Sequence, residues 1–336
     1  MNKILVICGP TATGKTALAL FLAEKFRGDI LSADSRQVYK RMDIITGKDL
    51  PVSSKLQISP ASPSEAGRAN VKWSRKRIRY WETQKTVRIW LVDLVEPWQD
   101  FSVSQWVGAA KKVIYNLWKE KKLPVIAGGT GFYIKALLDG IETIDIPPDE
   151  KLRNRLKNKK TEELLEILQK SDYQRAISLN ESDRKNPRRL VRAIEIALRR
   201  GSRQIPAHKE LKADALLIGL IAPRGTLRKR IDRRVEERLK QGALGEAKKL
   251  FAKGVSWNSE AMTGTGYRQL RRYFGGKETL SGAVALWKTA EYRDAKKQLT
   301  WFKKDRRIKW FDITGSKWRE KVEKTAGDWY HRNRET

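Results

Sequence analysis

Short apolar runs alternate with longer amphipathic stretches along this chain. Ile4 to Cys8, Leu123 to Ala127 and the LLIGLIA run at 216 to 222 have the length and branched apolar content of buried strands, and Asp29 to Ala33 (DILSA) is a shorter run of the same kind. Phe101 to Lys122 instead places its apolar residues at helical spacing: Val103, Trp106, Val107, Ala110, Val113, Ile114 and Leu117. Strands that alternate with helices predict an α/β fold with a parallel sheet.

The middle of the chain changes character. Residues 147–200 are helical in pattern, polar and basic, with no strand-like run, which predicts a helical insertion domain over 145–212. The α/β core would comprise 1–144 and 213–336, and the later part also holds C-terminal helices. Two helices are expected there, Thr226 to Gln241 and Tyr292 to Phe302.

An atypical insertion of about residues 49–90 interrupts the first part of the core. Pro51 to Asn70 contains three Pro and five Ser, which predicts a loop. Val71 to Val92 is rich in β-branched and aromatic residues between basic ones, which predicts a hairpin extension of the sheet. An RNA-contacting arm and a lineage-specific insertion both remain open as its role.

Composition narrows the class of protein. The 336 residues, 40% of them hydrophobic, suffice for a full core, and the apolar runs stay well below the ~18 residues of a membrane span. The N-terminal stretch lacks a signal-peptide pattern, so we expect a soluble, cytoplasmic protein. With one cysteine, Cys8, and two histidines, His208 and His331, the chain has neither a disulfide framework nor a Cys/His zinc cluster.

The net charge is strongly positive. Lys and Arg number 71 against 39 Asp and Glu, which gives +32 at pH 7. By our count the residues before Gly140 carry +11 and the rest +21, so most of the excess lies in the second part. A polyanionic partner and a charge adaptation of the whole proteome are the two explanations.

The clearest motif is GPTATGKT at 9 to 16, between the first apolar run and a helix-forming stretch. This order is typical of a phosphate-binding P-loop, in which backbone N–H groups and the helix N-terminus point at the anion. Lys15 would neutralise phosphate oxygens and the Thr16 hydroxyl would ligate Mg2+. The predicted anion-binding residues are Gly9, Thr11, Ala12, Thr13, Gly14, Lys15 and Thr16. The motif alone leaves hydrolysis, phosphoryl transfer and pyrophosphate departure open.

Two further turns follow predicted strands. Asp34 and Ser35 come directly after DILSA, and in open α/β sheets ligands sit at this carboxyl end, so both should lie near the P-loop. Asp34 could bind Mg2+ through water, accept a proton, or only cap the following helix. Gly128 to Gly131 (GGTG) has three Gly in four residues, which indicates either a close approach to the backbone or positive φ.

Seven blocks in order resemble the tRNA dimethylallyltransferases (tRNA isopentenyltransferases). They are GPTATGKT, ADSRQVYKRMDIITGK, AGGTGFYIKALLDG, NPRRLVRAIEI, APRGTLRKRIDRRVEERLKQG, GTGYRQL and YRDAKKQLTWF, and they span most of the chain. The chain departs from the family around 49–92, where Trp90 stands in a segment in which the family commonly has His, so the role of that His cannot be carried over.

The resemblance implies a P-loop NTPase-like core and transfer of a dimethylallyl group from dimethylallyl diphosphate to the adenosine next to the anticodon in tRNA. It implies that Arg234 contacts the diphosphate with Lys15 and with Mg2+ on Thr16, that Asp34 takes the proton of the adenine amine, and that Thr130 faces the channel between them. The expected tRNA contacts are Asp34, Ser35, Arg36, Gln37, Thr130, Arg153, Arg188, Arg189, Arg192, Tyr267, Arg268, Arg293 and Lys297.

The expected partners are therefore the anticodon stem-loop of tRNA and dimethylallyl diphosphate, with no membrane, for a monomeric enzyme. Three alternatives remain. An adenylate isopentenyltransferase would act on free nucleotide, and a small-molecule P-loop kinase would share the phosphate loop without needing the basic second part. A nonenzymatic RNA-binding module would leave the Gly-Lys-Thr sequence and Asp34 unexplained.

Overall fold

A computed structural model describes residues 2–48, 50, 55–58 (backbone), 78–141, 143–144, 146–200 and 211–332. They belong to two compact units: Met1–Leu138 with Leu211–Thr336, and Asp139–Glu210. The predicted insertion domain, 145–212, overlaps the second unit. Within the described ranges, none of the helices combines the length and apolar character needed to span a bilayer.

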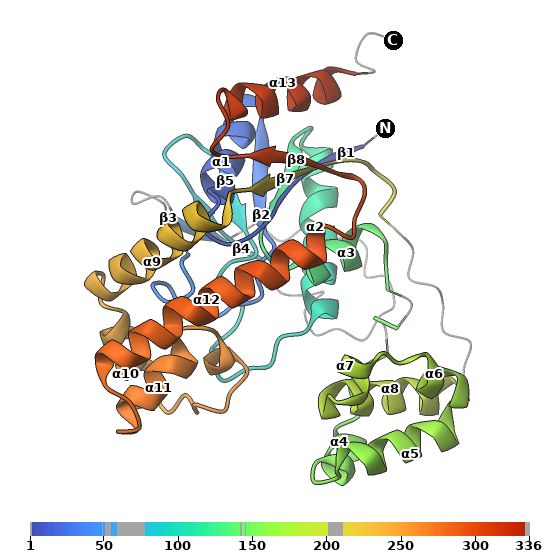
Figure 1. The fold of residues 1–336 in the computed structure, drawn as a ribbon. Coiled ribbons are helices and arrows are strands. Elements are labelled where there is room, and N and C mark those ends of the chain that lie inside the picture. Colours follow the sequence, from blue (N-terminus) through green and yellow to red (C-terminus); the bar gives the residue numbers. More distant parts are fainter. Residues whose placement is uncertain are drawn as a thin grey trace. The chain divides into compact units, whose positions relative to one another are not determined.

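One sheet forms the centre of the first unit (Figure 1), with the strand order β3-β4-β5-β2-β6-β1-β7-β8 in the part of the chain that the structure describes. The strands are β1 (Lys3–Cys8), β2 (Gly28–Ser32), β3 (Lys55–Ile58), β4 (Arg79–Glu82), β5 (Arg88–Trp90), β6 (Leu123–Ala127), β7 (Asp214–Ile221) and β8 (Ile308–Asp312). From β5 to β8 every neighbouring pair is parallel, whereas β3 and β4 run antiparallel at one edge. The carboxyl ends of β1, β2 and β6 therefore meet at the same edge of the sheet.

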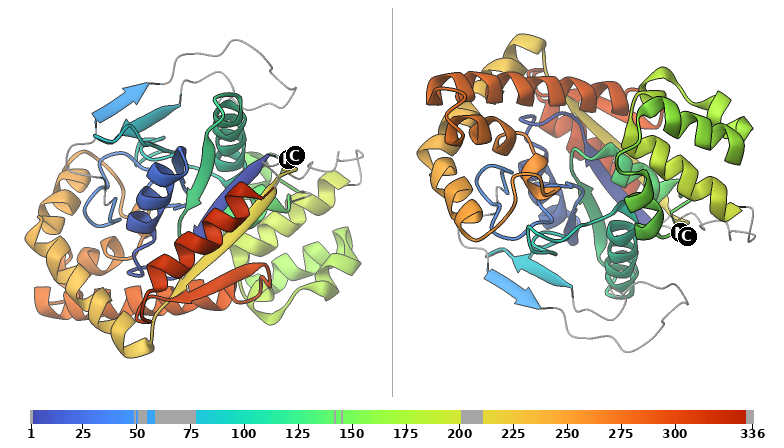
Figure 2. Two further views of the ribbon diagram at one scale, coloured as in Figure 1. Left: turned by 90° about the horizontal axis from the view of Figure 1, so that it is seen from above. Right: turned by 90° about the horizontal axis from the view of Figure 1, so that it is seen from below.

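Helices cover the sheet and extend beyond it. The first unit has α1 (Lys15–Lys25), α2 (Val103–Lys119), α3 (Gly131–Leu138), α9 (Arg224–Lys240), α10 (Ala243–Ala252), the short 3₁₀ helix η1 (Ala261–Thr263), α11 (Tyr267–Phe274), α12 (Leu280–Phe302) and α13 (Trp318–His331). Helices α1 and α13 share one core cluster with the sheet, and Phe26 meets Tyr330 at 4.9 Å between ring centroids. The long helix α12 runs beside α9 and α11 and reaches α3 (Figures 1 and 2).

A buried carboxylate fixes the amino ends of the strands. The Asp29 side chain is fully buried in β2 and lies 3.1 Å from Lys122 Nζ and 3.6 Å from Arg88 Nε. It also accepts a hydrogen bond of 3.2 Å from Trp90 Nε1. Two cations and an indole thus compensate the buried charge of Asp29. Removal of any of these partners would leave that charge less well compensated. Trp90, at the segment where the sequence departs from the family, is a structural residue here.

The second unit is a small helical body. It consists of α4 (Glu150–Leu156), α5 (Thr161–Ser171), α6 (Tyr173–Ser178), α7 (Glu181–Arg184) and α8 (Pro187–Arg200), with a leucine-rich core between α5 and α8. Glu195 of α8 is buried and accepts hydrogen bonds from Arg153 (2.6 Å, Nε) and Arg192 (2.9 Å, Nη1). Both arginines therefore have a role inside this unit.

The strand and helix predictions are confirmed for the four apolar runs and for the amphipathic stretch after Phe101. The predicted hairpin is confirmed by the antiparallel pairing of β4 with β5. The predicted loop at 51–70 is wrong at Lys55–Ile58, which pairs with β4 as strand β3, and its other residues lie outside the described ones. The predicted helix Tyr292 to Phe302 is the carboxyl half of the longer α12.

Candidate active site

The P-loop joins β1 to α1 with a shape that two glycines make possible. Gly9 has φ of 130°, and a Cβ there would lie 2.4 Å from the carbonyl oxygen of Leu220 in β7. Gly14 has φ of 86° and caps α1. Side chains are disfavoured at positive φ, and Gly9 in addition has no room for one. The loop therefore wraps in front of the α1 N-terminus, where unpaired backbone N–H groups favour an anion.

The polar side chains of the loop fold back over it. Lys15 Nζ donates a hydrogen bond of 2.6 Å to the carbonyl oxygen of Pro10, and Thr13 Oγ1 donates one of 2.9 Å to the same oxygen. Lys15 thus holds its positive charge inside the loop curve. The structure brings the predicted anion-binding residues together as one turn.

Helix α9 supplies cations to the same loop. Arg234 Nη1 donates to Thr11 Oγ1 at 2.8 Å, and its Nη2 lies 3.4 Å from the carbonyl oxygen of Gly47. A Cβ on Gly47 would lie 2.3 Å from Arg234 Nη2 and 2.2 Å from Arg238 Nη2. Gly47 therefore admits two guanidinium groups, of which that of Arg234 also contacts the P-loop, and the expected contact of Arg234 with the diphosphate stays a prediction.

Helix α12 bridges the P-loop and the GGTG turn. Gln298 Oε1 accepts a hydrogen bond of 2.9 Å from the N–H of Thr11, and its Nε2 donates one of 3.2 Å to the carbonyl oxygen of Gly129. A Cβ on Gly129 would lie 2.3 Å from Gln298 Nε2, and one on Gly131 would lie 2.1 Å from Trp301 Cδ1. The close approach predicted at these glycines is thus made by α12 side chains.

The segment after β2 lies beside the GGTG turn. Thr130 Oγ1 accepts a hydrogen bond of 3.0 Å from the N–H of Ser35. Asp34 is partly exposed, and its Oδ1 accepts the N–H of Arg36 at 2.8 Å in a tight turn. Within the described residues its Oδ2 has no hydrogen-bond donor. Asp34 therefore caps a turn, not a helix, with one oxygen and presents the other, and its chemical role stays a prediction.

Arg36 and Gln37 tie this segment to other parts of the unit. Arg36 Nη1 donates to the carbonyl oxygen of Glu260 at 2.6 Å. Gln37 Oε1 accepts from Ser32 Oγ at 2.9 Å, and its Nε2 donates to the carbonyl oxygen of Gly47 at 3.0 Å. Gly47 is therefore a shared point of contact for Gln37 and for the α9 arginine at the P-loop.

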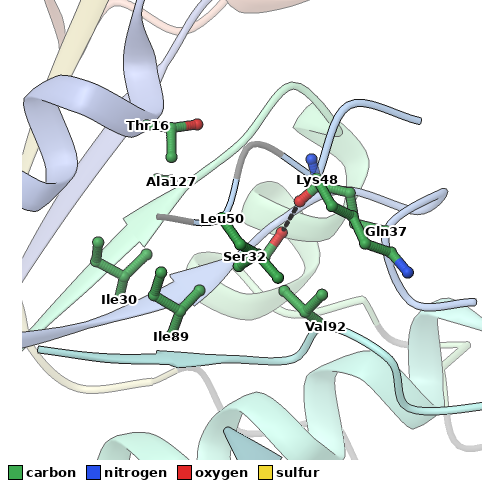
Figure 3. A pocket seen from close by; sticks show the side chains of 9 residues that line it. All are labelled: Thr16, Ile30, Ser32, Gln37, Lys48, Leu50, Ile89, Val92 and Ala127. Atoms are coloured by element: carbon green, nitrogen blue, oxygen red, sulfur yellow. Dashed lines mark hydrogen bonds between the residues drawn. The ribbon is translucent and has the colours of Figure 1, made fainter. Parts of the chain in front are cut away.

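A small cavity of about 30 Å3 lies behind these residues (Figure 3), with the Ser32–Gln37 hydrogen bond on its wall. It is lined by Thr16, Ile30, Ser32, Gln37, Lys48, Leu50, Ile89, Val92 and Ala127. Its size suits about one or two water molecules. Thr16, at the N-terminus of α1, shares this lining with Ser32, and the oxygen of a threonine hydroxyl suits Mg2+, which binds few protein ligands besides substrate phosphates.

A buried lysine that sequence analysis missed closes the cavity. Lys48 Nζ donates to the carbonyl oxygen of Tyr39 at 2.6 Å, to Asp43 Oδ1 at 2.7 Å and to Asp93. Asp93 follows β5 and also accepts from Trp81 Nε1 at 3.0 Å. The position of Asp93 directly after the apolar run IWLV was the signal in the sequence that could have identified this ion pair.

A carboxylate on α10 binds the backbone of residues 43–45, which precede Lys48. Glu246 accepts the N–H groups of Asp43 and Ile44 at 2.7 Å each, that of Ile45 at 3.1 Å, and the hydroxyl of Tyr267 at 2.6 Å. Burial and the neighbouring Glu246 raise the pKa of Tyr267 well above its ordinary value, so its hydroxyl stays a donor. Tyr267 is fully buried, and its expected RNA contact stays a prediction.

The other expected tRNA contacts are divided between the two units. Arg268, Arg293 and Lys297 belong to the first unit, where the last two line a shallow basic depression on α12 with Lys296, Thr300, Trp301 and Lys304. Arg153, Arg188, Arg189 and Arg192 belong to the second unit, where Arg189 pairs with Asp183 and two others bind Glu195. Their contacts with tRNA stay predictions.

Comparisons with known proteins agree with this geometry. Residues 80–305 match the family model "IPP transferase", and residues 2–59 match "Isopentenyl transferase". The chain is 34% identical to the tRNA dimethylallyltransferase of Carboxydothermus hydrogenoformans, over 96% of this chain and 95% of that protein. It is also 34% identical to the tRNA dimethylallyltransferase of Anoxybacillus flavithermus, over 93% and 91%.

Solved structures give the same result. The full-length tRNA isopentenylpyrophosphate transferase of Bacillus halodurans is 28% identical with a TM-score of 0.66, over 98% of this chain and 97% of that one. A eukaryotic dimethylallyltransferase acting on tRNA is 22% identical with a TM-score of 0.73, over 97% and 78%, which shows a shared fold. The resemblance seen in the sequence is confirmed, and so is the P-loop NTPase-like α/β core. The chain belongs to the IPP transferase family.

Proposed function

We propose that this chain is a monomeric cytoplasmic enzyme that transfers a dimethylallyl group from dimethylallyl diphosphate to the exocyclic N6 amine of the adenosine 3′-adjacent to the anticodon in tRNA, releasing diphosphate. The observation that carries the proposal is the convergence of a P-loop, an α9 arginine and the Asp34–Thr130 turns at one edge of the sheet. The names of the relatives support the choice of substrates.

The diphosphate end of the reaction belongs to the P-loop. Backbone N–H groups at the start of α1, Lys15 and Arg234 would bind the diphosphate and stabilise the charge that develops as the allylic C–O bond breaks. The Thr16 hydroxyl would hold Mg2+, which neutralises phosphate charge when bound. Preorganised cations lower the barrier because they need no reorientation as the leaving group departs.

The amine end belongs to the turn after β2. The adenine amine is a weak nucleophile because its lone pair is delocalised into the ring. As the new N–C bond forms, the amine loses a proton, which Asp34 would accept through Oδ2, the oxygen that the turn leaves available. Thr130 positions this turn through the N–H of Ser35. The base would have to leave its stack, which an anticodon loop permits more easily than a duplex.

The first experiment distinguishes this proposal from its alternatives. The protein is incubated with tRNA, Mg2+ and labelled dimethylallyl diphosphate, and the tRNA is digested to nucleosides. We expect label on N6 of one adenosine. Label on free AMP would support an adenylate isopentenyltransferase, and phosphate transfer from ATP to a metabolite would support a kinase.

The variant Asp34→Asn then tests the amine end. It keeps an acceptor for the turn but removes the base, so diphosphate and tRNA binding should remain while single-turnover transfer falls by about two to four orders of magnitude. Asp100→Asn, an exposed carboxylate change, is the matched control. Recovery of the Asp34→Asn rate at high Mg2+ would overturn the base assignment in favour of metal organisation.

A further inference from the structure

Four aromatic side chains gather on the surface where α10 and α11 end. Phe251 lies 5.4 Å from Trp257 between ring centroids, with 28° between the planes, and Trp257 lies 5.8 Å from Phe274 at 32°. Tyr273 adjoins Phe274 at 5.4 Å. We call Phe251, Trp257, Phe274 and Tyr273 the aromatic stack. Phe251 and Phe274 are 54% and 38% exposed, so the stack is not part of the core.

The surroundings of the stack are basic. Residues 247–279 contain seven cations and two acids, and both acids are paired: Glu260 with Arg36 and Glu278 with Arg272. Lys248 is exposed and stands three residues before Phe251 on α10, which places it on the same helix face. The exposed cations are Lys248, Lys249, Lys253, Arg268, Arg271, Arg272 and Lys277. The charge therefore suits a polyanion that also offers flat apolar surfaces.

One of these cations lies at the stack itself. Arg271 Nη1 donates a hydrogen bond of 2.9 Å to the side-chain oxygen of Asn258, the residue after Trp257. Aromatic rings next to cations are the arrangement by which proteins bind unpaired nucleotides, because bases stack on the rings while the cations meet the phosphates. Trp257 is in ring contact with both Phe251 and Phe274, and Phe251 is the more exposed of the two, so its ring is the one that a base can reach most easily.

The stack is also connected to the candidate active site. Trp257 is three residues before Glu260, whose carbonyl oxygen binds Arg36 Nη1 at 2.6 Å. Three residues span at most about 11 Å, and Arg36 is two residues after Asp34. The turn that holds Asp34 and the segment that holds Trp257 are therefore joined by one contact, and an RNA strand with one nucleotide at Asp34 can extend along it toward the stack.

We propose that the aromatic stack is a second base-binding site, on which an unpaired nucleotide near the modified adenosine stacks against the outer face of Phe251. This proposal rests on the proposed function for the identity of the RNA. In this proposal the α10–α11 end of the first unit binds the loop of the RNA. The cations around the aromatic stack bind the phosphates. Base stacking on one aromatic ring changes affinity by about five- to one-hundred-fold.

The test measures binding of an anticodon stem-loop at fixed salt to the wild type, Phe251→Leu and Phe251→Trp. Phe251→Leu keeps an apolar side chain without a flat ring, so we expect affinity for the stem-loop to fall by about five-fold or more. Phe251→Trp should bind at least as tightly as the wild type. Phe21→Leu, a change of a 40% exposed Phe on α1, is the matched control and should have no effect.

A blunt RNA duplex of equal charge separates stacking from simple attraction. It should bind the wild type and Phe251→Leu equally, because it has no unpaired base to offer. Unfolding midpoints should agree among the variants, since Phe251 is largely exposed. Wild-type affinity of Phe251→Leu for the stem-loop would overturn the stacking site, as would an equal loss for the duplex.

The outcome can be separated from that of the proposed function. If the wild type modifies tRNA and Phe251→Leu still binds the stem-loop normally, the stacking site fails alone. If no transfer occurs but stem-loop binding depends on the ring at 251, the stacking site stands and the transfer activity fails. If Phe251→Leu loses binding to an acidic protein but keeps binding to the stem-loop, the stack is a protein-docking surface and the proposal is overturned.

Discussion

The carboxylate of Glu246 offers the sharpest test of how the candidate site is held in place. It accepts four hydrogen bonds, three from consecutive backbone N–H groups at Asp43, Ile44 and Ile45 and one from the Tyr267 hydroxyl. That backbone leads within two residues to Gly47. Glu246→Gln should therefore loosen the segment whose carbonyl contacts the P-loop arginine.

The magnitude follows from the geometry of the two oxygens. In Glu246→Gln the remaining oxygen can still accept the two bonds to Asp43 and Ile44, which in the wild type share Oε2. The new NH2 group would then face the N–H of Ile45 and the hydroxyl of Tyr267. The hydroxyl can rotate and accept, but the N–H cannot. One charge-assisted bond is lost and one partly buried donor is left unpaired, which costs about 1.5–3 kcal/mol.

Urea unfolding of the full chain measures this cost. Tyr267→Phe removes only one of the four donors and should cost less, about 1 kcal/mol, and the double variant should show coupling because both changes act on one carboxylate. Glu237→Gln is the control, since it breaks only an exposed pair with Arg233 and should cost under about 1 kcal/mol. A Glu246→Gln variant as stable as the control would refute the four-donor assignment.

Two further predictions concern buried carboxylates. Asp29→Ala leaves two cations without their buried partner and should cost about 3–5 kcal/mol in urea unfolding, with a cost below 1 kcal/mol arguing against the buried cluster. Burial opposes ionisation of Glu195, but hydrogen bonds from Arg153 and Arg192 outweigh it and hold the pKa of Glu195 below the ordinary 4.5. The stabilisation that Glu195 contributes is therefore present above pH 4.5, and it is lost as the pH falls through the folded-state pKa. Glu195→Gln should flatten the loss of stability that circular dichroism measures as the pH falls below 4.5, and an unchanged acid profile would contradict this.

The parts of the fold that follow from local sequence were predictable. Buried strands are short apolar runs whatever surrounds them, and the P-loop needs glycine at Gly9 and Gly14 because of its own backbone angles. The family resemblance then supplied Arg234, which does lie against Thr11. Strand β3 escaped prediction because its four residues stand within a Ser- and Pro-rich stretch that otherwise reads as a loop.

The contacts that hold the site together were not predictable, since they join polar residues far apart in the chain. Gln298 meets Thr11 across 287 positions, and Glu246 meets Asp43 across 203. A polar side chain carries no sign in the sequence of whether it faces solvent or a backbone amide. The apolar periodicity that identifies a buried helix face is silent about buried polar partners.

Helix α12 shows why unpredicted polar contacts matter when a function is assigned to a basic stretch. Asp294, Gln298 and Trp301 recur at spacings of four and three, so they lie on one face, and they contact Thr265, the P-loop and the GGTG turn respectively. Lys297 stands next to Gln298 in sequence, so it is turned by about 100° around the helix axis. Its side chain is mostly exposed. Treating the whole stretch as one RNA-binding face merges two functions. One helix face contacts the P-loop and the GGTG turn, whereas Lys297 on another face is mostly exposed, so a substitution at Lys297 tests RNA binding without removing the contacts of Gln298 and Trp301.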